Sequence, residues 1–280
     1  MRVYAFASRA ILILGFLALL AAPAFASPIM VGGIRVDALS EQQREGSPGI
    51  LIGASSDDIA RYIPTGSYPM AANVFLVRTP DRTVLIDTGY GRNVEANLAS
   101  LGLKPEDIDA VLITHSHGDH IGGLLKDGAP AFPNATAYIA APEYEWSSAA
   151  REKLTPYART ELFTPGSLSE GAQLLTGVRP VAAYGHTPGH TLFMIESGGE
   201  KLLIWADLTH AMAIQIPLPR VSVTYDYDPV VAAMARELVL KHVSANKIPV
   251  AGMHIPNPAS GKITPNPDVP GGYMFEPTGE

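Results

Sequence analysis

Val111-Leu112-Ile113-Thr114-His115-Ser116-His117-Gly118-Asp119-His120 is an apolar run that ends in three histidines and one aspartate within six positions. The β-branched and apolar residues at its start favour a buried strand, and Gly118 permits a tight turn after it. Imidazole nitrogens and carboxylate oxygens presented from one short loop suit Zn²⁺. We therefore predict a strand that delivers a metal site at its carboxyl end, rather than a solvated polar loop.

This pattern, Thr-His-x-His-x-Asp-His behind an apolar strand, resembles the signature of the metallo-β-lactamase superfamily. The similarity extends over nearly all of the chain after residue 26. Within the superfamily, the sequence resembles the secreted branch that contains methyl parathion hydrolase, and also the related dinuclear-zinc lactonases. The resemblance implies an α/β fold, a four-layer αββα sandwich of two similar halves, with the site along one edge of the paired sheets.

The first 26 residues differ in composition from the rest. Arg2 and Arg9 give a basic start, residues 10–22 are almost wholly apolar, and Ala24-Phe25-Ala26 offers small residues to a signal peptidase. The apolar stretch is shorter than the roughly 20 residues that span a bilayer, which favours a cleaved leader over a retained anchor. We expect 1–26 to be a signal peptide, 27–280 to be one hydrolase domain, and the mature protein to be periplasmic or secreted.

The composition limits the class of protein. The chain has 280 residues, 47% of them hydrophobic and none of them cysteine, so it can bury a full core and suits an oxidising compartment. Loss of the leader would remove two arginines and no acids, and so shift the formal charge from −7 to −9. This acidic balance argues against nucleic acid as a partner. We expect a small-molecule substrate and no stable membrane anchor, and the sequence leaves both a monomer and a homodimer open.

Two β-rich runs, 73–77 and 83–86, are joined by Thr79-Pro80-Asp81-Arg82, which predicts a hairpin. The second run ends in Asp87. In the superfamily an aspartate at the end of this strand lies behind the metal loop, and Asp87 matches that position. We expect it to orient a ligand through hydrogen bonds, although a plain turn-capping role is the alternative.

A second histidine motif is Tyr184-Gly185-His186-Thr187-Pro188-Gly189-His190-Thr191, in which proline and glycine force a turn. Its match to the superfamily's second motif implies that His190 is a metal ligand. By the same match, His186 is expected to brace the loop.

Two more ligands are expected after later strands. A predicted hairpin of 192–195 and 201–205 ends in Ala206-Asp207, and the resemblance implies that Asp207 bridges two metals. The family more often has glycine where this chain has Ala206. The last core strand, 248–252, leads to His254 in a Gly-x-His-x-Pro sequence that resembles the branch's final ligand motif.

The resemblance thus implies two Zn²⁺ ions, one held by His115, His117 and His190, the other by Asp119, His120 and His254, with Asp207 shared. Such a pair lowers the pKa of a water between the ions, which provides a nucleophile near neutral pH. Asp119 is expected to handle a proton as well. His210, three residues after Asp207, either donates a hydrogen bond or a proton to the leaving group or simply packs.

Pocket-lining residues are harder to choose. Trp146 lies in a predicted helix over 142–154 and could line the substrate pocket, but an aromatic on an amphipathic helix more often joins the core. Residues 62–70 could form a lip over the site or an ordinary surface loop. Met212, Ile214 and Pro217 could form an apolar wall beside it.

The substrate follows from the resemblance alone. A lactone or ester is favoured, with a phosphotriester as the alternative; the absence of cysteine and the presence of Asp207 disfavour β-lactams. Two alternatives belong to other classes. A structural zinc site would be closed by four ligands, whereas seven candidates around two metals leave open positions. Redox di-iron relatives commonly carry glutamate where this chain has His117.

Overall fold

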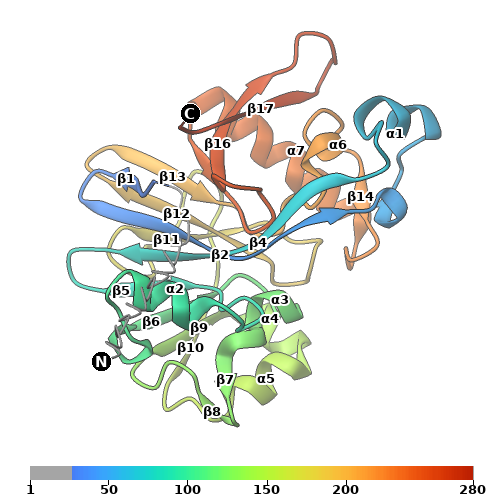
Figure 1. The fold of residues 1–280 in the computed structure, drawn as a ribbon. Coiled ribbons are helices and arrows are strands. Elements are labelled where there is room, and N and C mark those ends of the chain that lie inside the picture. Colours follow the sequence, from blue (N-terminus) through green and yellow to red (C-terminus); the bar gives the residue numbers. More distant parts are fainter. Residues whose placement is uncertain (1–26, 280) are drawn as a thin grey trace, which may run out of the picture.

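Two mixed β-sheets pack face to face at the centre of the protein, whose computed structural model describes residues 27–279 (Figure 1). The predicted leader, 1–26, lies outside the described residues. The first sheet has seven strands, in the order β1 (Ile29–Val31), β2 (Ile34–Gly46), β4 (Tyr68–Arg78), β5 (Thr83–Ile86), β6 (Ala110–Ile113), β9 (Thr136–Ala140) and β10 (Thr160–Phe163). The predicted hairpin is confirmed as β4 and β5, with Phe75 opposite Ile86.

The second sheet has six strands, in the order β11 (Val178–Ala182), β12 (Thr191–Ser197), β13 (Glu200–Ile204), β15 (Val250–Ala251), β16 (Ser260–Pro265) and β17 (Tyr273–Pro277). The hairpin predicted around Ser197 is confirmed as β12 and β13. Two small ribbons pair β3 (Leu51–Ile52) with β14 (Ser222–Val223) and β7 (Leu125–Lys126) with β8 (Ala129–Pro130).

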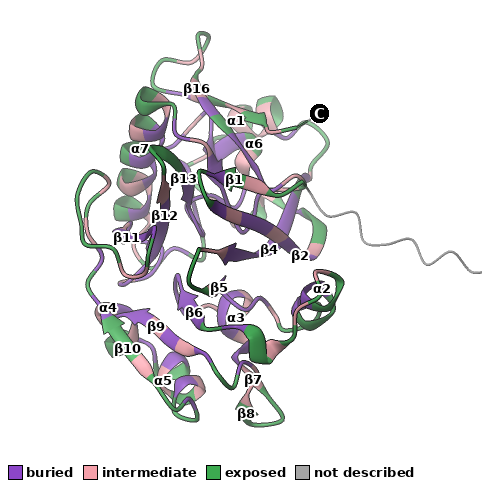
Figure 2. Ribbon diagram, turned by 90° about the vertical axis from the view of Figure 1, so that its left-hand side faces the viewer, coloured by how far each residue is buried: buried purple, intermediate pink, exposed green. Residues whose placement is uncertain are grey.

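Helices cover the outer faces of both sheets (Figures 1 and 2). On the first sheet these are α2 (Val94–Ser100), α3 (Gly118–Ile121), α4 (Ala141–Trp146) and α5 (Ser148–Leu154); the second sheet carries α7 (Pro229–Asn246). The short helices α1 (Ser56–Tyr62) and α6 (Met212–Gln215) contact each other, and single 3₁₀ turns are η1 (Pro48–Ile50), η2 (Pro105–Asp107) and η3 (Gly122–Leu124). The αββα sandwich is therefore confirmed. No helix within residues 27–279 is both long and apolar enough to cross a membrane.

The core follows the period-two alternation of β-strands. In β6, Leu112 points between the sheets and packs with Phe193 and Trp205 of the second sheet, whereas Val111 and Ile113 pack outward against the α2–α5 side. Because both faces of β6 are covered, all four of its residues are buried. This explains why the run reads as continuously apolar in the sequence.

The predicted helix over 142–154 is two helices. Ser147 has extended backbone angles, ends α4, and caps α5 by accepting a hydrogen bond from the Ala150 amide at 3.1 Å. The serine side chain bonds to a backbone amide and so starts a new helix at this point. The sequence periodicity, which continues across Ser147, does not reveal this break. Trp146, the last residue of α4, is 42% exposed. It contacts the ring of Tyr227 edge-on, with centroids 5.6 Å apart, and does not join the core.

The two sheets bring the carboxyl ends of several strands to one edge. β6 runs parallel to β5 and β9, and β13 runs parallel to β15. The segments that follow β6, β11, β13 and β15 therefore lie at this shared edge, and they contain every candidate ligand predicted from the sequence.

Candidate metal centre

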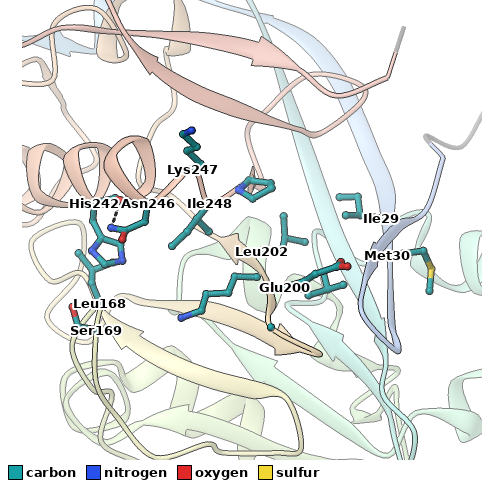
Figure 3. A pocket seen from close by; sticks show the side chains of 14 residues that line it. Ile29, Met30, Leu168, Ser169, Glu200, Leu202, His242, Asn246, Lys247 and Ile248 are labelled. Carbon is teal, nitrogen blue, oxygen red and sulfur yellow. Dashed lines mark hydrogen bonds between the residues drawn. The ribbon is translucent and has the colours of Figure 1, made fainter.

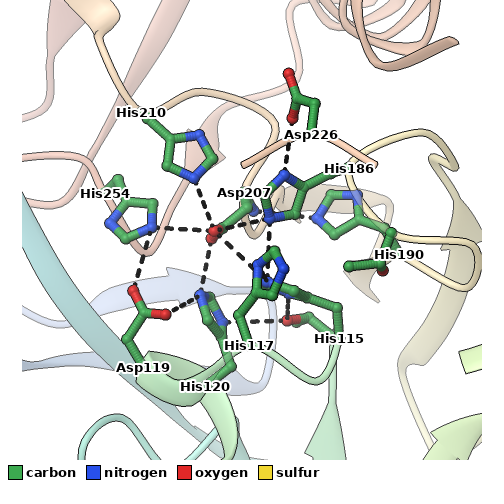
Figure 4. Close-up of polar contacts among 12 residues, drawn as sticks. His115, His117, Asp119, His120, His186, His190, Asp207, His210, Asp226 and His254 are labelled. Atoms are coloured by element: carbon green, nitrogen blue, oxygen red, sulfur yellow. Dashed lines mark hydrogen bonds and ion pairs between the residues drawn. The ribbon is translucent and has the colours of Figure 1, made fainter. Parts of the chain in front are cut away.

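Imidazoles and carboxylates from four loops converge at the shared edge of the sheets (Figure 4). They form three overlapping groups, and within each group one donor atom of every residue lies within 4.8 Å of the others. The groups are His115, His117, His186 and Asp207; Asp119, His120 and His254; and Asp207, His210 and His254. Asp207 joins the first group to the third, which places its carboxylate at the middle of the cluster.

The first group has the spacing of a tetrahedral metal site. His115 Nε2 lies 3.1 Å from His117 Nδ1 and 3.2 Å from His186 Nε2. Ligands about 2.0–2.1 Å from a tetrahedral zinc are separated by roughly 3.3 Å, close to these values. Three ring nitrogens directed at one another cannot all be satisfied by a shared proton, so this set fits a cation.

Two buried atoms at the second group have no hydrogen-bond partner. One is His120 Nε2, which belongs to this group, and the other is Asp207 Oδ1, which lies 3.0 Å from it. His254 Nε2 lies 3.1 Å from Asp207 Oδ2 and 3.6 Å from Asp119 Oδ2. Because buried polar atoms are normally paired, these orphaned nitrogen and oxygen atoms fit a second metal position that shares Asp207 with the first.

The geometry corrects the sequence-based choice between the two histidines of the 184–191 loop. His190 does not lie in any of the three groups: its Nδ1 donates to the Ala183 carbonyl at 2.8 Å, and its Nε2 accepts from the Asp207 amide at 3.1 Å. With both nitrogens bound to backbone, His190 has no free donor for a metal. His186, expected to brace the loop, points into the cluster, and His190 does the bracing.

Three of the candidate histidine ligands are held by a second contact, as is usual for histidines at metal sites. Asp87 accepts hydrogen bonds from His120 Nδ1 at 2.7 Å and from the Thr114 hydroxyl at 2.7 Å. The predicted orienting contact of Asp87 is thus confirmed. His254 Nδ1 donates to the Ala71 carbonyl of β4 at 2.7 Å.

The corresponding support of His186 was missed in the sequence. Asp226 Oδ1 lies 2.8 Å from His186 Nδ1. Asp226 follows β14, 40 residues after His186, and no local spacing relates the two. A second missed residue is Glu143 of α4, which is fully buried and whose carboxylate contacts both histidine loops.

Two residues at strand ends adopt left-handed backbone conformations. Asp87 has φ of 61° and Ala206 has φ of 49°. This conformation costs a residue with a Cβ roughly 1–2 kcal/mol relative to the ordinary helical region. This conformation favours glycine, so the chain accepts some backbone strain at Ala206, directly before Asp207.

His210 lies beside Asp207, with its Nε2 3.0 Å from Asp207 Oδ2 and its ring centroid 5.0 Å from that of His186. Gln215 fixes its backbone by accepting from the amides of His210 and Ala211 at 2.7 and 2.9 Å. Burial lowers the pKa of His210 to about 4, although Asp207 opposes this shift. The imidazole is therefore neutral at pH 7.

Charges inside the cluster compensate one another. Burial disfavours charge on Asp207, yet His120 and His254 hold the pKa of its carboxyl well below the usual range. Burial also opposes protonation of His186, but hydrogen bonds to Asp207 and Asp226 raise the pKa of this imidazole to about 8. Protonated imidazoles thus balance the carboxylates, and a metal ion would take over this role with release of protons.

A cavity of about 400 Å³ opens onto the cluster. It is lined by Arg44, Tyr90, His117, Gly118, Asp119, Asp207, His210, Tyr225 and His254. A second, apolar cavity of about 550 Å³ is lined by Tyr62, Pro69, Met212, Pro217 and others. Of the three residues predicted as an apolar wall, Met212 and Pro217 line this second cavity, whereas Ile214 is fully buried.

A further cavity of about 600 Å³ lies away from the cluster, beside the end of α7 (Figure 3). Glu200, Lys201, His242 and Lys247 are among its lining residues. His242 is the only one of the eight histidines in the sequence that takes no part in the cluster or its support. None of the candidate ligands lines this cavity.

Curated relatives match short parts of the chain. The exodeoxyribonuclease WalJ of Streptococcus pneumoniae is 44% identical over 55 residues, which are 19% of this chain and 20% of that protein. The lactamase-like protein ptaB of Pestalotiopsis fici is 34% identical over 126 residues, which are 44% of this chain and 36% of that protein. The chain thus matches about a fifth to a third of the length of these relatives.

Solved structures match nearly the whole fold. The hydrolase AbOPH of the beta lactamase superfamily has 24% identity and a TM-score of 0.80, over 91% of this chain and 98% of that one. AidC, a dizinc quorum-quenching lactonase solved with a product, has 24% identity and a TM-score of 0.79 over the same shares. The sequence model described as the Metallo-beta-lactamase superfamily matches residues 67–244, more than half of the chain. The protein belongs to the metallo-beta-lactamase superfamily.

Proposed function

We propose that this protein is an exported metal-dependent hydrolase that binds two divalent ions, expected to be zinc, and opens a lactone or ester. The observation that carries the proposal is the convergence of six ligand candidates around the buried carboxylate of Asp207. The side chain of Asp207 is 1% exposed, and it lies within 3.6 Å of a ring nitrogen of five histidines. A buried carboxylate in that setting is suited to bridging two cations.

His115, His117 and His186 would hold the first metal, Asp119, His120 and His254 the second, and Asp207 both. Bound there, the pair supplies Lewis acidity toward the substrate's electrophilic oxygen and acidifies water to give a nucleophile at neutral pH. Three terminal ligands and one shared carboxylate leave each position open to substrate, which argues against a closed structural site.

Two residues of the chain are assigned to steps beside the metals. The Asp119 side chain is 19% exposed and faces the cavity. Burial opposes its charge, but His120 lowers the pKa of Asp119, so the carboxylate can accept a proton from the incoming water. His210 is neutral, and we assign it a hydrogen bond toward the leaving-group side rather than donation of a proton.

The surroundings support a substrate with an uncharged, partly apolar body. Tyr90 and Tyr225 line the cavity at the metals. Met212 and Pro256 line the second, apolar cavity, and each lies two residues after a histidine of the cluster. An acyl or alkyl group extending from a lactone or ester carbonyl suits this combination. The similarity in fold to the lactonase AidC agrees with this choice.

The test is hydrolysis of a panel by the mature protein with quantified metal. The panel holds an acyl-homoserine lactone, an aryl ester, a neutral phosphotriester and a β-lactam. We expect preferential turnover of the lactone or ester, abolished by Asp207→Ala and unaffected by His242→Ala, a matched change at the histidine outside the cluster. Faster turnover of the phosphotriester would instead support the alternative function, a phosphotriester hydrolase.

Metal analysis separates the other classes. Two tightly bound zinc ions with no turnover of any ester, lactone or phosphotriester would contradict this substrate class. Two irons with redox activity would replace the hydrolase proposal by a di-iron protein, and failure to bind two metals would overturn the mechanism. Sizing of the mature protein tests the proposed homodimer, and fractionation of the producing cell tests export.

A further inference from the structure

Glu143 is a fully buried carboxylate that no step of the proposed reaction uses. It lies in α4, which begins directly after β9, and β9 pairs in parallel with β6. Because the carboxyl ends of adjacent parallel strands meet at one edge, α4 lies beside the loop that follows β6. This placement brings Glu143 next to the first histidine motif.

The two oxygens of Glu143 serve two different loops. Oε1 accepts hydrogen bonds from the Ser116 amide at 2.8 Å and the Ser116 hydroxyl at 2.5 Å. Oε2 accepts from the Thr187 hydroxyl at 2.6 Å and the Gly189 amide at 2.9 Å. One carboxylate therefore ties the loop after β6 to the loop after β11, which belong to different sheets.

The partners of Glu143 are the immediate neighbours of the first metal's ligands. Ser116 lies between His115 and His117, and Thr187 follows His186. None of these partners adjoins His254, and the nearby ligand His120 is oriented separately by Asp87. Glu143 therefore bonds to residues that adjoin the ligands of the first metal position. The second position's histidines are held instead by Asp87 and by a backbone carbonyl of β4.

The packing around Glu143 is also close. A Cβ added at Gly189 would collide with the backbone nitrogen and the Cβ of Glu143. Glycine at this position thus allows the second histidine loop to approach α4 closely enough for the Oε2 contacts. The loop geometry and the carboxylate depend on each other.

We propose that Glu143 is a positioning residue that holds His115, His117 and His186 in register across the two sheets, and so sets the affinity of the first metal position selectively. This inference rests on the proposed function, since it assumes that these histidines bind a metal. Supporting contacts of this kind typically change metal affinity by about 10–100-fold.

The test compares Glu143→Gln with Glu145→Gln in the full mature protein. Glutamine keeps the size of Glu143 but offers only one acceptor oxygen, and its amide group would face the donors of one loop. Glu145 is an exposed glutamate on the same helix and serves as the control. Zinc affinity at each position is measured by competition with a chromophoric chelator. We expect Glu143→Gln to weaken one of the two zincs by about 10–100-fold and Glu145→Gln to change neither.

Backgrounds that retain one position identify which metal is affected. With His254→Ala, which leaves the first position, Glu143→Gln should weaken the remaining zinc. With His117→Ala, which leaves the second, it should not. Suppose that the wild-type protein binds two zincs. If Glu143→Gln then weakens both positions equally, or changes neither, the positioning role is overturned and the proposed function stands. A wild-type protein that binds no zinc pair would overturn the proposed function together with this inference.

Milder variants keep the test valid if Glu143→Gln does not fold. Ser116→Ala and Thr187→Val each remove one hydroxyl donor from opposite sides of the carboxylate. We expect each to weaken the first zinc, and their combined effect to differ from the sum, because both act through one side chain. Strict additivity, or a fall in unfolding temperature without selective loss of zinc, would contradict the proposal.

Discussion

The two sheets supply the site in different ways. The first contributes four ligand candidates from one loop of six residues, 115–120, behind a single strand. The second contributes His186, Asp207 and His254 one at a time, from loops after three strands. The residues of the first contribution are grouped by local chain geometry, whereas each residue of the second is supplied by a different loop. Variants of the second sheet should therefore separate the roles of individual ligands.

The largest effect is expected at Asp207, where both contributions meet. Asp207→Ala removes the only carboxylate common to both positions, so metal binding and turnover should fail together. We expect kcat/KM to fall by at least about 10³-fold, equivalent to about 4 kcal/mol. Metal content by elemental analysis and hydrolysis of the best panel substrate measure this. Retention of two metals would show that the sheets contribute independently.

The pair His186→Ala and His190→Ala sharpens the comparison within one loop. His186→Ala should lose one metal. His190→Ala should keep both ligand sets but leave the Asp207 amide and the Ala183 carbonyl unpaired, at about 1–3 kcal/mol for each buried group. Thermal unfolding and metal content, measured on both variants, separate the effects. The reverse pattern would restore His190 as the ligand.

The metal-free protein should lose stability in acid. Burial lowers the pKa of His190 to about 3 and of His210 to about 4, below the ordinary 6.5. Below pH 6.5 these histidines are protonated in the unfolded chain but stay neutral in the folded protein. The free energy of unfolding is therefore highest above pH 6.5 and falls progressively as the pH is lowered toward about 4. Urea titrations of chelated protein at several pH values test this. A flat profile over that window would contradict the burial of neutral imidazoles.

The smallest effect is expected at Ala206. Glycine adopts a φ of 49° without the steric cost that alanine bears. Ala206→Gly should therefore raise the unfolding free energy by about 0.5–1 kcal/mol, which corresponds to roughly 1–4 °C in unfolding temperature for a domain of this size. Calorimetry checks the shift. A decrease would mean that the buried methyl group contributes more than the backbone strain costs.

The grouping of the first sheet's candidate ligands could be predicted from the sequence because the information is local. The strand, the turn and the candidate ligands lie within 111–120, and Asp87 follows the neighbouring strand. The layered fold was predicted from the resemblance of the histidine motif to the superfamily. The prediction was poorer where contacts with residues far along the chain decide which histidine faces the cluster. His186 and His190 have similar neighbours in sequence, and only their contacts with Asp226 and with the Asp207 amide distinguish them. The role of Glu143 could not be predicted for the same reason, since its partners lie 27 to 46 residues away in the sequence.

The arrangement of ligands has a consequence for folding as well as for catalysis. Candidate ligands from His115 to His254 span half of the chain, which has no cysteine. A bound metal pair would close long loops between the two halves and reduce the freedom of the unfolded chain, as disulfides do in many secreted proteins. Metal acquisition would then act as the cross-linking step of maturation, independent of the redox state of the compartment.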